Sequence, residues 1–247
     1  MSAFTALAKT QSKVFLREPA SVFFALVFPG LLLFVIGTVF PGSTEQNVEL
    51  GGRSLVEIYA PVSIALGLAT VALTILPATL GGDRERGILR RLSATPAHPA
   101  TLVAVHCAVQ LAVVTIATVV AIVVGMVVFG MSLPGLPGWF VVSFVLGALA
   151  LLSVGLLIGA LVSTANSGQA IGMLLYFPLL FFAGVYVPLE VMPEGVRAVS
   201  RFTPSGAAVQ ALSASWAGDV PSTSSLLVMA GVALIAGSLA IWRFRWN

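Results

Sequence analysis

Side chains that bind metals or form covalent cross-links are scarce in this chain. Its 247 residues include one cysteine, Cys107, and two histidines, His98 and His106. A single thiol excludes a disulfide framework and a cysteine-based zinc site, and it leaves the redox compartment open. Two histidines without an H-E-x-x-H spacing do not build a metal centre. The sequence therefore predicts no metal site and no cofactor held by this chain.

Charged side chains are also few. They make up 9% of the residues, whereas 58% are hydrophobic and the mean hydropathy is +1.06. One core in a chain of this size could not hide so much apolar surface from water. The pI near 9.5 would suit a nucleic-acid partner, but the basic residues fall in short segments between apolar runs. We therefore predict an integral membrane protein in contact with lipid, and no nucleic-acid partner.

Six uncharged stretches are long enough to cross a bilayer, which takes about 20 apolar residues in a helix. They cover residues 21–40, about 58–80, about 101–130, about 139–162, about 169–188 and about 225–242. These stretches are too long for barrel strands and lack their alternation. The first one exceeds the apolar region of a signal peptide and has no clear cleavage site after it. The expected fold is a single all-α membrane domain over residues 1–247, with six transmembrane helices.

The distribution of Lys and Arg predicts the orientation of this domain. Nine of the twelve lie at the two ends of the chain and between the second and third stretches, on one side of the membrane. Only Arg53, Arg197 and Arg201 lie on the other side. Positive charge is enriched in cytoplasmic segments. We therefore expect a multi-pass protein of a bacterial inner membrane, with both termini and residues 81–99 in the cytoplasm.

The leader, residues 1–19, has the pattern of an amphipathic helix lying at the membrane interface. One face carries the apolar residues Phe4, Leu7, Ala8, Val14 and Phe15, and the opposite face carries Lys9, Lys13 and Arg17. Two roles stay open for this helix. It is either an anchor at the membrane surface or a shaft that transmits motion from a cytoplasmic partner to the first span.

The stretch "GGDRERGILRRLSATPAHP" (81–99) concentrates four of the twelve basic residues within eight positions. Asp83 can cap a helix, and Ile88, Leu89 and Leu92 form a narrow apolar edge on it. The glycines and prolines around it predict a short helix that ends by Thr95. This cationic segment would either dock a partner or only enforce topology and touch anionic lipid.

A second segment, 188–224, is too polar to span a membrane and too apolar for an exposed loop. Val196 and Val199 share one helical face, and Val209, Leu212 and Trp216 share another, with Pro204 between the two. We predict two short helices that re-enter the outer leaflet.

The order of these segments resembles the ABC-2 type permeases, the membrane subunits of bacterial ABC exporters, and most of all their daunorubicin-resistance group. The resemblance covers essentially the whole chain. One family motif corresponds to Arg84, Glu85, Arg86, Gly87 and Pro96. A second corresponds to Pro188, Pro193 and Pro204.

The resemblance implies that residues 81–99 hold a coupling helix that docks in a cleft of a separate ATPase subunit. The docking candidates are Arg84, Glu85, Arg86, Gly87, Ile88, Leu89, Arg90, Arg91, Leu92 and Pro96. A Walker A motif needs Gly before its Lys, and neither Lys9 nor Lys13 follows a glycine. ATP and Mg²⁺ would therefore be bound by the partner, and this chain would not be an enzyme. The resemblance also implies a second permease subunit, as a homodimer or with a related chain.

The cargo is predicted to be hydrophobic or amphipathic. No Asp, Glu, Lys or Arg lies in the middle of any span, which disfavours a proton- or sodium-driven carrier. Tyr176, Phe177, Phe181 and Phe182 could stack on planar drugs, although aromatic residues in a span more often face lipid. Lipids, glycolipids and polysaccharide precursors stay open as cargo. A non-transporting membrane anchor is the less favoured alternative.

Overall fold

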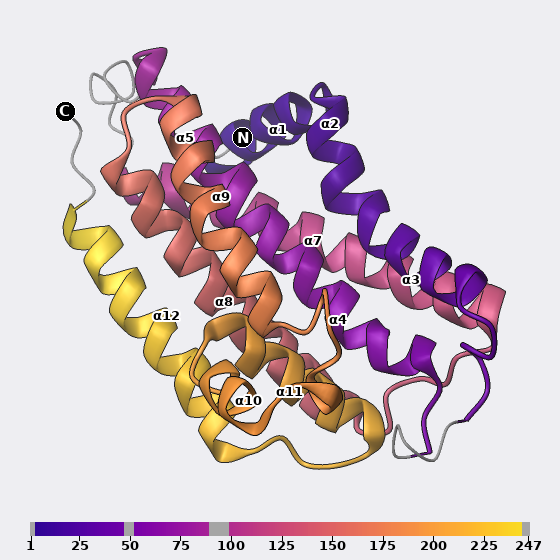
Figure 1. Ribbon diagram of the computed structural model, residues 1–247. Helices are drawn as coiled ribbons and strands as arrows, with labels where there is room; N and C mark the ends of the chain where they lie inside the picture. Colours follow the sequence, from indigo (N-terminus) through magenta and orange to yellow (C-terminus); the bar gives the residue numbers. More distant parts are fainter. Residues whose placement is uncertain (1–2, 47–51, 89–98, 244–247) are drawn as a thin grey trace.

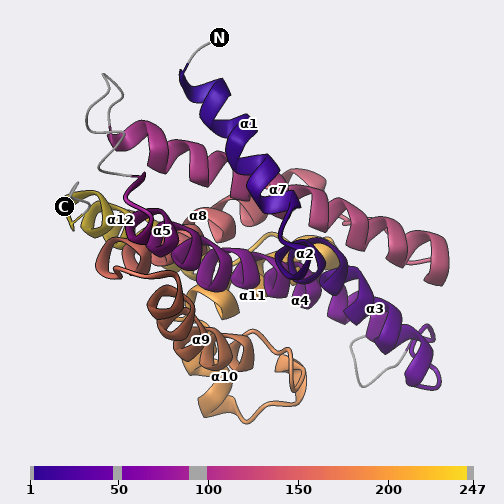
Figure 2. The same ribbon diagram turned by 90° about the horizontal axis from the view of Figure 1, so that it is seen from above.

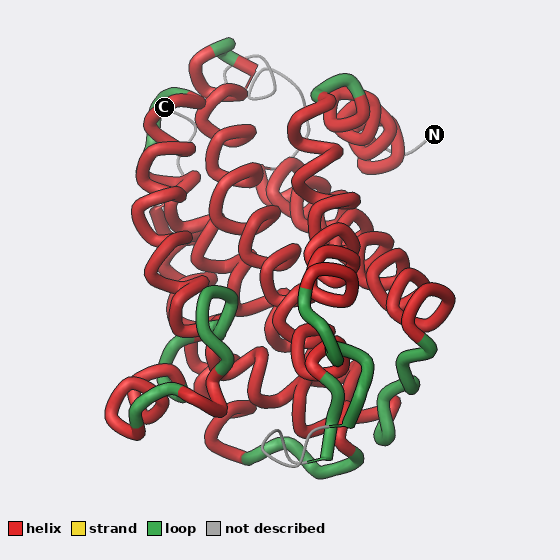
Figure 3. Tube along the Cα trace, turned by 45° about the vertical axis from the view of Figure 1, so that its right-hand side comes forward, coloured by secondary structure: helices red, strands yellow, loops and turns green. Residues whose placement is uncertain are grey.

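A computed structural model describes residues 3–46, 52–88 and 99–243, and it shows helices joined by loops (Figures 1 and 3). In this part of the chain, six helices are long and apolar enough to cross a membrane. They are Pro19–Val39, Leu55–Glu85, Thr101–Phe129, Pro137–Leu161, Ala165–Phe182 and Thr223–Arg243. The predicted all-α fold with six membrane-spanning helices is confirmed.

Two of the spans contain a π-helical segment. The first comprises α2 (Pro19–Val22), the π-helix η1 (Phe23–Val27) and α3 (Phe28–Val39), and the second α4 (Leu55–Ala69), the π-helix η3 (Thr70–Ile75) and α5 (Leu76–Glu85). The other spans are α7 (Pro99–Phe129), α8 (Pro137–Leu161), α9 (Ala165–Phe182) and α12 (Thr223–Arg243). The shorter elements are α1 (Ala3–Leu16), η4 (Leu189–Val191), α10 (Glu194–Ser200) and α11 (Pro204–Ala217).

The second span is the centre of the bundle. In its most apolar stretch 94% of the residues are buried, against 28% in the first span and 17% in the fifth. Glycines on α8 and α9 let the backbones of these two helices approach the second span closely. A Cβ at Gly155 of α8 would overlap the carbonyl oxygen of Ala72, and one at Gly172 of α9 would overlap that of Leu73. Both carbonyls belong to η3, so α8 and α9 pack directly against the π-helical segment.

The fifth span is shorter than predicted. It ends at Phe182 instead of continuing to residue 188, because Gly184 adopts a left-handed conformation with φ of +81°. The amide of Val185 donates to the carbonyl of Leu180, and that of Gly184 to Phe181. This is the Schellman arrangement that commonly ends a helix at glycine. Tyr186, which the sequence placed in this span, therefore lies in the loop that follows.

The leader forms α1, as predicted, and crosses α7 at one end of the bundle (Figure 2). Phe15, on its predicted apolar face, is buried, whereas Phe4 is exposed. The ends of α5 and α12 lie at the same end of the molecule as α1 (Figure 1). We call this the α5 end, and we call the opposite end, where α10 and α11 lie, the α11 end.

The two short helices predicted between the fifth and sixth spans are present as α10 and α11. Pro204 is the first residue of α11, and the Thr203 hydroxyl accepts a hydrogen bond from the amide of Gly206. Val209, Leu212 and Trp216 are buried together, as the pattern predicted. Since α11 packs against α4, α8 and α12, it is an integral part of the bundle.

Candidate functional site at the end of the second span

The acidic and basic residues that begin the 81–99 segment belong to the second span itself. Helix α5 continues without a break through Asp83 to Glu85, and the chain then turns at Gly87, where φ is +67°. The prediction that Asp83 caps a new helix is therefore wrong. Asp83 lies in the last turn of α5 and is only 2% exposed. We call residues 83–86 the root of the loop.

Arg84 closes the end of α8. Its Nη1 donates to the carbonyl oxygens of Gly159, Ala160 and Val162, at 2.9, 3.1 and 2.6 Å. The last carbonyls of a helix have no partner within the helix and carry partial negative charge. A guanidinium placed there satisfies several of them at once, so Arg84 joins the second span to the fourth.

Glu85 makes the corresponding contact with the next helix. Its Oε2 accepts a hydrogen bond from the backbone amide of Ala165, the first residue of α9, at 3.2 Å. A carboxylate is favourable at a helix N-terminus, where amides are unpaired and the helix dipole is positive. Arg84 and Glu85 thus bind the two sides of the turn between α8 and α9.

Asp83 connects the second span to two further helices. Its Oδ2 lies 3.0 Å from Nε2 of His106 on α7 and accepts from Nε2 of Gln11 on α1, at 3.3 Å. The two nitrogens are 3.2 Å apart. Because a carboxylate only accepts, the bond from His106 places a proton on Nε2. Arg86, which is largely exposed, adds a 3.4 Å contact to Oδ1.

The role of His106 in this cluster was missed from the sequence. His106 is 2% exposed, and it is bonded to the carboxylate of Asp83, which is equally buried. The available signal was its place near the start of an otherwise uncharged span, because a polar residue buried there needs a partner. Three consecutive residues, Asp83 to Glu85, hold contacts with α1, α7, α8 and α9.

The remaining docking candidates divide into two sets. Gly87 ends α5 and Ile88, which follows it, is half-buried. Leu89, Arg90, Arg91, Leu92 and Pro96 lie outside the described residues, so docking at these positions stays a prediction. We call residues 89–96 the tip of the loop.

The four aromatic residues proposed for the cargo path do not converge. The Tyr176 hydroxyl lies 2.9 Å from the hydroxyl of Thr70 in η3, so this ring faces the second span. Phe177 and Phe181 are exposed on the outside of α9, as in a surface that faces lipid, and Phe182 is half-buried. Tyr176 is the one member that touches the centre of the bundle, and a role for any of them in transport stays a prediction.

Among the residues that the structure describes, no group of three or more His, Cys, Asp or Glu side chains is placed to hold a metal ion. Asp83 instead accepts hydrogen bonds from His106 and from the amide of Gln11. The site at the root of the loop is therefore a set of hydrogen bonds between helices.

Comparison with known proteins gives two matches. The protein-family model described as "ABC-2 type transporter" matches residues 2–216. The chain is also similar to the "Putative transport permease ycf38" of Cyanophora paradoxa, with 25% identity over 190 residues. That alignment covers 76% of this chain and 65% of the relative, so the chain spans less than two thirds of the relative's length. Because the family model matches most of the chain, and six helices in the described residues are able to cross a membrane, this protein belongs to the ABC-2 type transporter family.

Proposed function

We propose that this chain is the permease of an ATP-driven exporter that moves a hydrophobic or amphipathic cargo out of the cytoplasm or the inner leaflet. Its power would come from a separate ATPase that docks on residues 83–95 and binds ATP and Mg²⁺. Two permease subunits, identical or related, would form the working unit. Family membership supports this proposal. A drug-like cargo follows from the resemblance to the daunorubicin-resistance group.

The observation that carries the proposal is the set of contacts at the root of the loop. Asp83, Arg84 and Glu85 bind four other helices through side-chain hydrogen bonds. A displacement applied to the adjoining loop would therefore act on α1, α7, α8 and α9 together instead of bending a free connection. Coupling between a soluble motor and a membrane domain needs such a rigid junction.

The contacts of Arg84 also favour different roles for the arginines of this segment. The Arg84 guanidinium faces the carbonyls at the end of α8, so its hydrogen bonds are directed into the bundle. We assign docking chiefly to the tip, where Arg90 and Arg91 can form bidentate bonds to carboxylates of the ATPase. Leu89 and Leu92 would supply the apolar edge predicted from the sequence.

The placement of charge supports an apolar cargo. Within the six spans, charged residues occur only near the helix ends, at Glu57, at the root of the loop and at Arg243. A carrier driven by protons or sodium usually keeps an ionisable group near the middle of the membrane. An uncharged interior suits drug-like molecules and lipid chains.

The experiment that tests this function is transport in proteoliposomes. The chain is reconstituted with the Walker-containing ATPase encoded beside it, and efflux of a fluorescent planar drug and movement of a fluorescent lipid are followed separately. We expect ATP-dependent movement of at least one probe, and none when the Walker lysine of the ATPase is replaced. If neither moves although ATP is hydrolysed, the proposed range of cargo is wrong. If the ATPase does not join the complex, the exporter assignment fails.

A further inference from the structure

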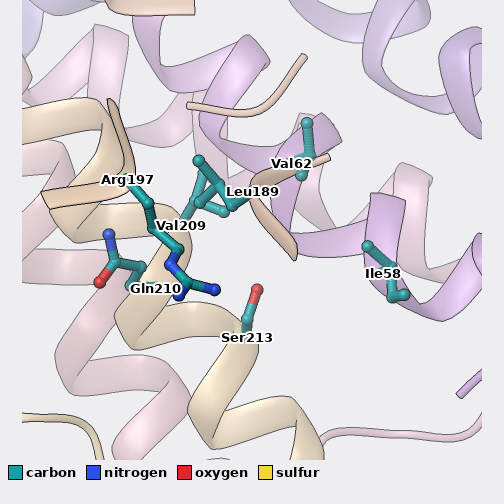
Figure 4. A pocket seen from close by; sticks show the side chains of 7 residues that line it. All are labelled: Ile58, Val62, Leu189, Arg197, Val209, Gln210 and Ser213. Atoms are coloured by element: carbon teal, nitrogen blue, oxygen red, sulfur yellow. The ribbon is translucent and has the colours of Figure 1, made fainter. Parts of the chain in front are cut away.

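A cavity of about 190 Å³ opens at the α11 end, where the second span meets the segment between the fifth and sixth spans. Three of its lining residues are polar, Arg197 on α10 and Gln210 and Ser213 on α11. The others are apolar: Ile58, Val62, Leu189 and Val209. In Figure 4 the Arg197 side chain extends between Gln210 and Ser213, with Ile58 and Val62 across the opening. The cavity thus combines one cationic group with an apolar wall.

The guanidinium of Arg197 has no partner in the described part of the chain. Its Nε is buried and makes no hydrogen bond there. Glu194, one turn earlier on the same helix, forms no ion pair with it, and Glu57, beside Ile58, is bonded instead to Ser54 and Ser132. A buried N–H without an acceptor is costly, because the group has lost its hydrogen bond to water. An anion at this position would remove that cost through charge-assisted hydrogen bonds.

The size of the cavity indicates how much of a ligand it holds. A water molecule takes about 30 Å³ of liquid volume, and a pocket for a whole drug-sized ligand has roughly 300 Å³ or more. About 190 Å³ therefore fits a phosphate or carboxylate with the first carbons of a chain. The segment that carries Leu189 and Arg197 also exposes Val191 and Phe202, at 63% and 74%. The segment that lines part of the cavity therefore also presents exposed apolar side chains.

From this geometry we infer that the cavity at Arg197 binds the head group of an anionic amphiphile. Arg197 takes the phosphate or carboxylate, Gln210 and Ser213 donate further hydrogen bonds, and the apolar wall takes the start of the hydrocarbon chain. The ligand is either an anionic lipid of the adjacent leaflet or an anionic amphiphilic cargo, because both present the same chemistry. Binding needs no ATPase, so the site is tested on the permease in isolation, and its failure would leave the proposed docking untouched.

Protection of a cysteine in the cavity tests this inference. Ser213→Cys is introduced into full-length protein with Cys107→Ser, and modification by N-ethylmaleimide is timed in phosphatidylcholine nanodiscs. Dodecyl phosphate should slow the reaction, whereas uncharged dodecanol and inorganic phosphate at the same concentration should not. Arg197→Gln should weaken the protection about tenfold, as expected for loss of a charge-assisted bond. Arg201→Gln, at an exposed arginine just after α10, is the matched control and should leave the protection unchanged.

Nanodiscs that contain phosphatidylglycerol distinguish the two sources. Slow modification of S213C in these discs, without added probe, assigns the site to membrane lipid. Fast modification there, together with protection by dodecyl phosphate, assigns it to a diffusing amphiphile such as the cargo. The inference is overturned if dodecyl phosphate and dodecanol act alike, if inorganic phosphate protects equally well, or if R197Q stays protected. Arg197→Lys, which keeps the charge, should retain part of the protection and guards against a folding defect in R197Q.

Discussion

Arg84 and Arg197 carry the same side chain at opposite ends of the molecule, but they differ in their hydrogen bonds. Arg84 donates to three backbone carbonyls at the end of α8. Arg197 lines an open cavity, with no hydrogen bond from its guanidinium to any described residue. The Nε atoms of both arginines are buried without an acceptor among the described residues, but Nη1 of Arg84 joins two helices, whereas the guanidinium of Arg197 makes no such bond and is available to a ligand. The role of each arginine therefore depends on the groups that surround it in the folded protein. The residue type alone does not distinguish a structural role from a binding role.

Substitution of Asp83, which bonds to α1 and α7 at the α5 end, should have the largest effect on stability. Asp83→Ala leaves the buried His106 and the half-buried Gln11 without their shared acceptor. We expect a loss of about 3 kcal/mol in the free energy of unfolding, because removing one partner of a buried polar pair is strongly destabilising. Unfolding in mixed micelles measures it, with Glu45→Gln, at an exposed residue, as control. A loss equal to that of the control would show that the cluster does not hold the α5 end together.

The close approach of backbones at the second span should give the next largest effect. Gly172→Ala places a methyl group on the carbonyl of Leu73, and α9 has to shift away from η3. Overpacking of this kind costs roughly 1–3 kcal/mol. Gly231→Ala on α12, where an added Cβ meets no atom within 4 Å, is the matched control. It should be neutral or slightly stabilising, since alanine favours a helix. Equal effects at the two glycines would contradict the packing described for the second span.

Much of this architecture could be predicted from the sequence, whereas the contacts at the root of the loop could not. Uncharged runs of spanning length predict six helices because the length requirement is physical. The partners of Arg84 are backbone carbonyls 75 to 78 residues away, and every residue has such a carbonyl. No side-chain pattern could therefore identify them. The early end of the fifth span was available in the sequence, because Gly184 is the residue type that ends helices.

Substitution of Arg84 should have a smaller effect on the free energy of unfolding. Arg84→Gln removes the charge from the end of α8 and should lower the free energy of unfolding by about 1.5 kcal/mol, the lower range for bonds from a charged donor. Arg84→Lys should restore part of this, since a cation still favours a helix C-terminus. The same unfolding assay checks both variants. If R84Q unfolds like the native chain, the arginine does not stabilise the bundle.

The opposite arginine should give the smallest effect on stability. Arg197→Gln removes a charge that has no described partner, so the free energy of unfolding should change by less than about 0.5 kcal/mol, as for ordinary surface substitutions. The measurement is unfolding in phosphatidylcholine without an anionic amphiphile. A loss as large as that of R84Q would mean that Arg197 is structural, and the contrast between the two arginines would disappear.

Retention of the ATPase during purification tests whether docking depends on the root or on the tip of the 81–99 segment. Both variants keep every positive charge: Arg84→Lys with Arg86→Lys at the root, and Arg90→Lys with Arg91→Lys at the tip. Lysine preserves the expected orientation but lacks the planar guanidinium. We expect the root variant to retain the ATPase while unfolding more easily, and the tip variant to lose it. Loss of the ATPase from the root variant alone, with its stability unchanged, would contradict the assignment of docking to the tip.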